Sequence, residues 1–142
     1  MSNVMHIEPV PGAPIACDMS AASDTLDERL LEYRRLYERA LVRRERREDA
    51  VVFHFRAGGG TREAVEDLAR REAACCPFLD YRVETVETEV IWTTTSPVAG
   101  DERASVDAIL DAFHALPDHA DSDIGRLFGR LTERGVDLPR LL

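Results

Sequence analysis

Two adjacent cysteines, Cys75 and Cys76, lie one helical turn after the acidic residue Glu72 and directly before Pro77. The thiolate form of cysteine is both a strong nucleophile and a soft metal ligand. Two neighbouring thiols beside a carboxylate therefore suit a thiophilic metal or metalloid, or a redox-active thiol pair. This cluster has the clearest chemical potential in the sequence.

The segment that must position this cluster is predicted to be a helix over about 61–76. Val65, Leu68 and Ala69 recur at helical spacing, and Glu72 continues the same apolar stripe. An ionised carboxylate on an apolar face is costly unless it is paired, hydrogen-bonded, ligating or protonated. The alternative is that Glu72 lies at the edge of the stripe and reaches water.

The two cysteines project about 100° apart on a helix, so both cannot fill the same core position. Together with the turn that Pro77 forces, this favours a thiol that faces a pocket. The alternative is that they are space-filling core residues, because cysteine is often buried. Cys17 supplies a third sulfur if the N-terminal segment folds over the end of the helix. With three cysteines and no secretion signal, we expect reduced thiols.

Several ligands fit such a site to different degrees. Structural zinc usually takes four Cys or His ligands with C-x-x-C spacing, which the sequence lacks. A metal site of Cys17, Cys75 and Cys76 suits cuprous copper, mercuric ion or trivalent arsenic because all three are soft. Haem with Cys76 as axial thiolate is a weaker alternative. In an enzymatic alternative, Cys75 or Cys76 is a nucleophile or redox thiol and Glu72 transfers its proton.

The composition limits the partners. The 142 residues include 18 Lys and Arg against 27 Asp and Glu, which gives a net charge of -9. This balance argues against nucleic acid or an anionic membrane surface and favours a neutral or cationic small ligand. The first twenty residues lack the basic and continuously apolar regions of a signal peptide, and no apolar stretch reaches the ~20 residues that a membrane span needs. We therefore expect a cytoplasmic protein.

Hydrophobic periodicity and turn residues indicate the other elements. A capping pattern at Thr25 and Glu28 predicts a helix start. The expected elements are a helix from there to a basic end at 43–47, a strand over 50–56, a Gly-rich turn over 58–60, a helix that Thr61 caps, strands near 80–87 and 89–96, and a helix over about 101–116 that Pro117 stops. This order predicts an α+β two-layer sandwich, with a small antiparallel sheet of about three strands and helices packed on one face.

Three regions are expected along the chain: an N-terminal arm over 1–16, a core domain over 17–117 and a helical tail over 118–142. Proline and glycine without apolar periodicity suggest the arm. The tail is expected to form a short amphipathic helix that either caps the domain or binds a second copy as a homodimer, through Ile124, Leu127, Phe128 and Leu131.

The residues from Arg71 to Tyr81, together with Cys17 before a long helix, resemble a group of small bacterial proteins with an E-x-x-C-C-P-F motif. The resemblance covers about residues 15–116. Some members of this group are associated with heavy-metal response, such as mercury resistance. The resemblance implies a site that contains Glu72, Cys75 and Cys76, with Cys17 as an additional donor.

Overall fold

The computed structural model describes residues 4–14, 24–96 and 102–119 of the chain. Helices and strands alternate in an order close to the one that the sequence predicts. The elements are β1 (Val4–Ile7), α1 (Leu26–Ala40), β2 (Leu41–Arg46), β3 (Ala50–Arg56), α2 (Thr61–Cys75), β4 (Asp80–Val86), β5 (Glu89–Thr95) and α3 (Arg103–His119).

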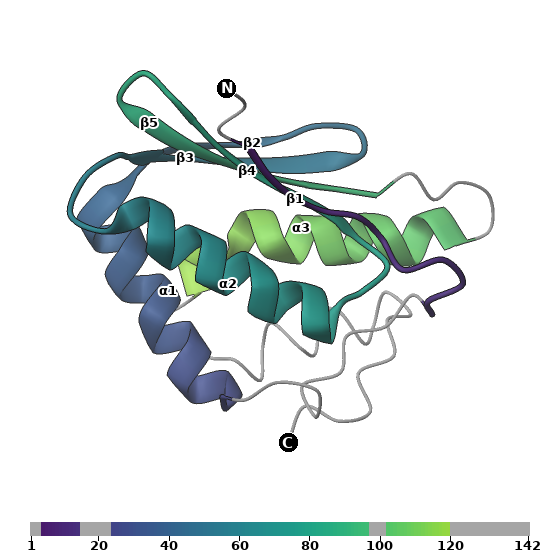
Figure 1. Ribbon diagram of the computed structural model, residues 1–142. Coiled ribbons are helices and arrows are strands. Elements are labelled where there is room, and N and C mark those ends of the chain that lie inside the picture. The colour runs from purple at the N-terminus through teal and green to yellow at the C-terminus, as the bar shows by residue number, and fades with distance from the viewer. Residues whose placement is uncertain (1–3, 15–23, 97–101, 120–142) are drawn as a thin grey trace.

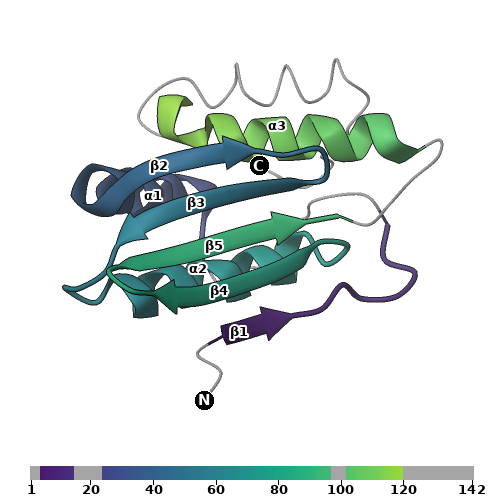
Figure 2. The ribbon, with the colours of Figure 1, turned by 90° about the horizontal axis from the view of Figure 1, so that it is seen from above.

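The strands form one sheet in the order β1-β4-β5-β3-β2, and every neighbouring pair is antiparallel. Figure 2 shows this order across the sheet, and Figure 1 shows the three helices on the same side of it. The predicted α+β class is confirmed, but the expected sheet of about three strands is wrong because the sheet has five. Within the described residues, no helix has both the length and the apolar character needed to cross a membrane.

The central strands build the hydrophobic core beneath the sheet. Strand β3 has the predicted bounds, and its alternate residues Val51, Phe53 and Phe55 are buried in the core. Phe53 pairs with Trp92 of β5, and Trp92 in turn pairs with Val83 of β4. Their side chains share one face of the sheet because successive residues of a strand point to opposite faces. The helices pack against that face.

One of the two additional strands lies in the segment predicted as an N-terminal arm. Strand β1 pairs with β4, with Met5 opposite Val83 and Ile7 opposite Tyr81. Farther along, the backbone N–H of Val10 donates to the carbonyl of Pro77 at 2.8 Å. The first part of the chain therefore lies along the edge of the sheet and against the turn that follows α2.

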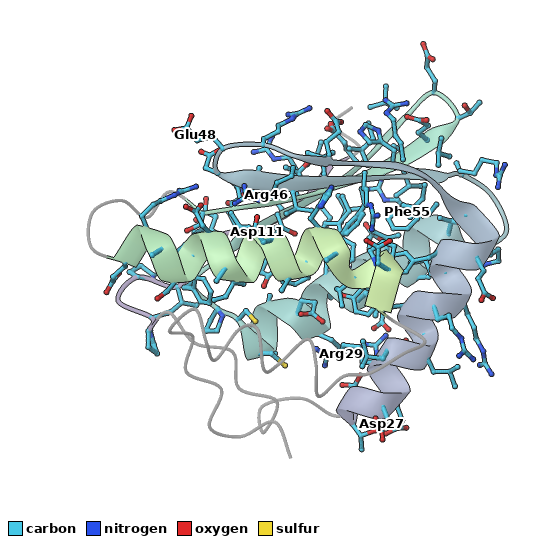
Figure 3. The ribbon with its side chains drawn as sticks, turned by 180° about the vertical axis from the view of Figure 1, so that it is seen from behind. Asp27, Arg29, Arg46, Glu48, Phe55 and Asp111 are labelled. Carbon is cyan, nitrogen blue, oxygen red and sulfur yellow. The ribbon has the colours of Figure 1, made fainter. Side chains whose placement is uncertain are left out.

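The other additional strand replaces the predicted basic end of the first helix. Helix α1 ends at Ala40, and the chain continues directly into β2, which pairs with β3. Arg46 forms ion pairs with Asp107 and Asp111 of α3, and Figure 3 shows Arg46 and Asp111 between the sheet and that helix. Arg46 thus links the sheet to α3, whereas the sequence predicted that this basic segment would be the end of the first helix.

Helix α3 does not stop at Pro117, as the sequence predicts, but continues to His119. Proline fixes a backbone angle that a helix can accept and removes one backbone donor. Arg44 of β2 supports this last turn by donating to the carbonyl of His114 at 2.9 Å and by pairing with Asp118. The tail predicted beyond it, with its amphipathic helix, lies outside the described residues from 120 onward.

Glycine residues form the turn between β3 and α2, as predicted. Gly58, Gly59 and Gly60 all have positive φ, a conformation that favours glycine. Gly60 occupies the N-cap position expected for Thr61, and Thr61 is the first helical residue. The Thr61 hydroxyl donates to the carbonyl of Gly58 at 2.7 Å and so closes the turn.

The burial of Phe55, which Figure 3 labels on β3, gives a direct test of this core. Phe55 is 0% exposed and its ring stacks on Tyr37. Phe55→Ala should lower the free energy of unfolding by about 3–5 kcal/mol through lost burial and a cavity. Val86→Ala, at a side chain that is 47% exposed, should change it by less than about 0.5 kcal/mol. Urea denaturation measures both, and equal effects would contradict this packing.

Candidate thiol and ion-pair site

Helix α2 carries Glu72 and both cysteines into the protein interior. The stripe predicted from the sequence is buried, and Glu72 itself is only 8% exposed. Cys75 and Cys76 are each 2% exposed. The alternative in which Glu72 reaches water at the helix edge is therefore wrong, and its carboxylate needs a partner inside the protein.

Arg29 of α1 is that partner. Its Nη1 atom donates to Glu72 Oε1 at 2.9 Å and to Cys75 Sγ at 3.4 Å. The Arg29 side chain is 2% exposed, and Figure 3 shows it where α1 faces the other helices. One buried cation thus joins the carboxylate and the thiol that the sequence predicts to lie together.

The start of α1 holds a second carboxylate against the same cation. The Thr25 hydroxyl accepts from the Glu28 N–H at 3.2 Å, and the Glu28 carboxylate accepts from the Thr25 N–H at 3.0 Å. This capping box places Asp24, directly before the cap, where its oxygens accept from Arg29 Nη2 at 2.6 Å and Nε at 3.0 Å. Such bidentate pairs are the stronger form of arginine–carboxylate contact.

Arg71 of α2 extends the cluster toward the surface. It donates to Asp24 Oδ2 at 2.9 Å, Asp67 Oδ2 at 2.7 Å and Glu32 Oε2 at 2.5 Å. We call these side chains, with Arg29 and Glu72, the Arg29 network. The network connects the start of α1 to the last two turns of α2, where the cysteines lie.

Burial and pairing act differently on the two carboxyl groups that contact Arg29. Hydrogen bonds from Arg29 lower the pKa of Asp24 from its ordinary 3.8 to about 2. Burial raises the pKa of Glu72 above its ordinary range, and the nearby charge of Arg29 offsets this only in part. Asp24 is therefore the firmly ionised partner of Arg29, whereas Glu72 is the group that takes up a proton more readily.

The Cys75 thiol is also shifted toward its protonated form. Burial raises its pKa, and the hydrogen bond from Arg29 counteracts this incompletely. A thiol with a raised pKa stays protonated at neutral pH and is a poor nucleophile in that form. Ligand binding at Cys75 must therefore displace the thiol proton.

Cys76 ends the helix and differs from its neighbour in redox state. Its backbone N–H donates to the Glu72 carbonyl at 2.7 Å, and its carbonyl accepts from the Tyr81 hydroxyl at 3.0 Å. Cys76 is disulfide-bonded, whereas Cys75 retains its thiol. The expectation that all thiols are reduced is thus wrong for Cys76. The described residues contain no third cysteine, since Cys17 lies outside them.

Two tyrosines of α1 face the same region. Tyr33 and Tyr37 follow Arg29 at intervals of four residues, and burial, then the charge of Glu72, raise the pKa of both. Neither hydroxyl has a hydrogen-bond partner of normal length among the described residues. The Tyr33 hydroxyl nevertheless interacts with the Glu72 carboxylate, so the two groups belong to one buried polar cluster.

The structure places Glu72, Cys75 and Cys76 together at the end of α2, where Arg29 contacts Glu72 and Cys75. Sequence reasoning missed Arg29 and Asp24, although a signal for Arg29 was present. Arg29 stands four residues before Tyr33 and therefore on the apolar face of its helix, the same anomaly that identified Glu72. Among the described residues, no cluster of three or more His, Cys, Asp or Glu side chains is arranged to hold a metal ion.

His54 of β3 belongs to a separate cluster on the sheet face opposite Phe53. Its ring nitrogens contact Glu45 Oε2 at 2.6 Å and Glu89 Oε1 at 3.2 Å, and its side chain is buried. His54 is thus a buried residue whose two ring nitrogens are both satisfied by carboxylates.

Comparison of the chain with protein-family models, curated proteins and solved structures finds no match. The site must therefore be interpreted from its own geometry.

The lowered pKa of Asp24 makes a pH-dependent prediction. Because the folded-state pKa lies below the ordinary value, Asp24 stabilises the fold above about pH 4 and loses this contribution as the pH falls toward 2. Asp24→Asn should therefore lower the free energy of unfolding at neutral pH, and its difference from wild type should shrink between pH 4 and 2. Asp27→Asn, at an exposed position in the first turn of α1, is the control in urea denaturation. A difference that persists unchanged at pH 2 would contradict the Asp24–Arg29 pairing.

Proposed function

We propose that this protein captures or senses a thiophilic metal, metalloid or related small compound through its cysteines. The ligating groups are the thiols of Cys75 and Cys76 in their reduced forms, with Cys17 as third donor. Glu72 acts as ligand or proton acceptor. The resemblance to proteins of heavy-metal response points to the same class of ligand.

The observation that supports this proposal most directly is that Arg29 Nη1 donates both to the Cys75 sulfur and to the Glu72 carboxylate. A buried ion pair beside a thiol is costly to maintain unless geometry and hydrogen bonding are favourable. Here it fixes a sulfur atom next to a group that accepts protons, which is the arrangement that proton-releasing thiol ligation needs. Cys76 follows in the next position of the chain.

The disulfide at Cys76 represents the oxidised form in this proposal. A dithiol reductant supplies two electrons and two protons, is itself oxidised to a disulfide, and returns two thiols to the protein. Glutathione and thioredoxin systems maintain such reduced thiols in the cytoplasm, which is where we place the activity. Reduction is therefore the step that makes the full set of sulfur donors available.

Catalysis by a cysteine is the second candidate function, and the disulfide is the observation that favours it. A redox enzyme commonly pairs an attacking thiol with a second cysteine that resolves the intermediate. The raised pKa of Cys75 counts against this candidate, because reactive cysteines usually have lowered pKa values. Haem ligation by Cys76 stays a prediction that no contact of the described residues favours.

The double variant Cys75→Ser/Cys76→Ser tests the capture function. The reduced wild type should bind mercuric ion, arsenite or cuprous ion tightly. Removing a residue that only supports a metal ligand typically weakens metal binding 10–100-fold. The double variant loses two ligating atoms, so its affinity should fall by more than this. Native mass spectrometry and isothermal titration calorimetry measure the bound species and its affinity.

Ala74→Ser, at an exposed position on the same helix end, is the matched control and should bind as wild type does. Urea denaturation establishes that each variant is folded. Unchanged binding in the double variant, or no binding to the reduced wild type, would refute the capture function.

The rate of Cys75 alkylation as a function of pH separates capture from catalysis. For the reduced protein we expect a midpoint above the ordinary thiol value of ~8.5, because burial disfavours the thiolate. Iodoacetamide labelling with tandem mass spectrometry reads the modification at Cys75 alone. A midpoint well below the ordinary value would instead support the enzymatic candidate.

A further inference from the structure

The two neighbouring cysteines differ in redox state although both are buried. Cys75 retains its thiol, whereas Cys76 is disulfide-bonded. The whole chain contains three cysteines, and the third is Cys17. A disulfide joins two cysteines, and Cys75 takes no part in this one. Within a single chain, Cys17 is therefore the remaining candidate for the partner of Cys76.

The segment that precedes Cys17 in the chain is held beside Cys76. The backbone N–H of Val10 donates to the Pro77 carbonyl at 2.8 Å, and the N–H of Ala13 donates to the Val10 carbonyl at 3.1 Å. Ala13 is thus anchored next to the residue that follows Cys76. An extended chain advances at most ~3.3–3.6 Å per residue, so the step from Ala13 to Cys17 covers up to roughly 14 Å. This reach allows Cys17 to meet Cys76.

The segment that follows Cys17 returns to the same end of α2. Asp24 pairs with Arg29, and Arg29 Nη1 lies 3.4 Å from Cys75 Sγ. Successive side chains on a helix point about 100° apart, and the backbone leaves the helical conformation at Cys76. Arg29 therefore holds the sulfur of Cys75, while the side chain of Cys76 points in another direction, as a separate partner requires.

We propose that Cys76 is cross-linked to Cys17, which lies outside the described residues, and that this disulfide is a redox switch that turns capture off. This inference rests on the proposed capture function and adds its regulation. In the oxidising direction, two thiols form one sulfur–sulfur bond, and hydrogen peroxide takes up their two electrons and two protons and leaves as two molecules of water. A dithiol of the thioredoxin type reverses the step and is itself oxidised to a disulfide.

The switch acts by changing the number of sulfur donors. The disulfide withdraws Cys17 and Cys76 from the proposed set of three, and leaves only the Cys75 thiol, which is 2% exposed. Donors held on one chain bind an ion together far more tightly than one donor alone, because each further contact is intramolecular. The reduced protein should therefore capture a soft ion, whereas the oxidised protein should release it or fail to bind it.

Peptide mapping of the oxidised wild type tests the cross-link without any ligand. The full-length protein is treated with hydrogen peroxide, unfolded in urea, alkylated with iodoacetamide and digested with trypsin. Cleavage after arginine places Cys17 in peptide 1–29 and the adjacent cysteines in peptide 72–82. Mass spectrometry should recover these two peptides as one linked species with the alkyl group on Cys75. Dithiothreitol should separate them, and Cys75→Ser, the matched control, should keep the link.

Titration of mercuric chloride into the reduced and oxidised proteins tests the switch. Calorimetry should show that the oxidised wild type binds more than about 100-fold more weakly, because loss of two ligating sulfurs exceeds the effect of losing a supporting residue. Cys17→Ser cannot form the cross-link and should bind mercuric ion equally before and after peroxide treatment. Dithiothreitol is removed before each titration, and urea denaturation establishes that each protein is folded.

The outcomes separate the inference from the function on which it rests. Recovery of peptides 1–29 and 72–82 as separate species, or an alkyl group on Cys76, overturns the cross-link and leaves capture by the reduced protein standing. A cross-linked protein that binds mercuric ion as tightly as the reduced one overturns the switch. Failure of the reduced wild type to bind refutes the capture function, and the switch with it, even where the peptide map shows the cross-link.

Discussion

The guanidinium of Arg29 must keep its charge where almost no water reaches it, and the arrangement of α1 and α2 follows from this constraint. Burial opposes its charge, but contacts with Asp24, Glu72 and Cys75 outweigh burial and raise its pKa. Removing one partner of a buried pair generally costs about 3–5 kcal/mol because the other charge is left uncompensated. The start of α1 and the end of α2 are therefore held by the same cation, Arg29. The contact with Arg29 that positions the Cys75 sulfur is thus part of an ion-pair network whose main role is structural.

The parts of the fold that the sequence predicts well are those in which burial follows a regular period. Strand β3 and helix α2 have the expected bounds within one residue because alternating or helically spaced apolar side chains define them. Strands β1 and β2 are edge strands that mix charged and apolar residues, and their extended form depends on hydrogen bonds to β4 and β3. Because β4 is distant from β1 in the chain, the local sequence of β1 gives little indication of this pairing.

The same distinction applies to the site. Glu72 was identifiable because an acid on an apolar stripe is anomalous, and Arg29 satisfies the same criterion on its own helix. Two opposite charges on the buried faces of two helices are expected to pair if those helices pack, but the helix packing itself is a tertiary property. Asp24 carries no such signal, because its role depends on the capping box that begins at the next residue, Thr25, and places Asp24 beside Arg29.

The contrast between the two carboxyl groups bears on the choice between the two proposed functions, capture and catalysis. A nearby cation activates a cysteine when its charge is available to the thiolate. Here Asp24 occupies two nitrogens of Arg29 and is firmly ionised, and Glu72 occupies the nitrogen that also contacts sulfur. Most of the cation's field is thus already compensated, and burial of the thiol dominates its pKa. The sulfur is thus held in place by Arg29 while burial keeps its pKa raised, which is the state that the proposed capture function requires.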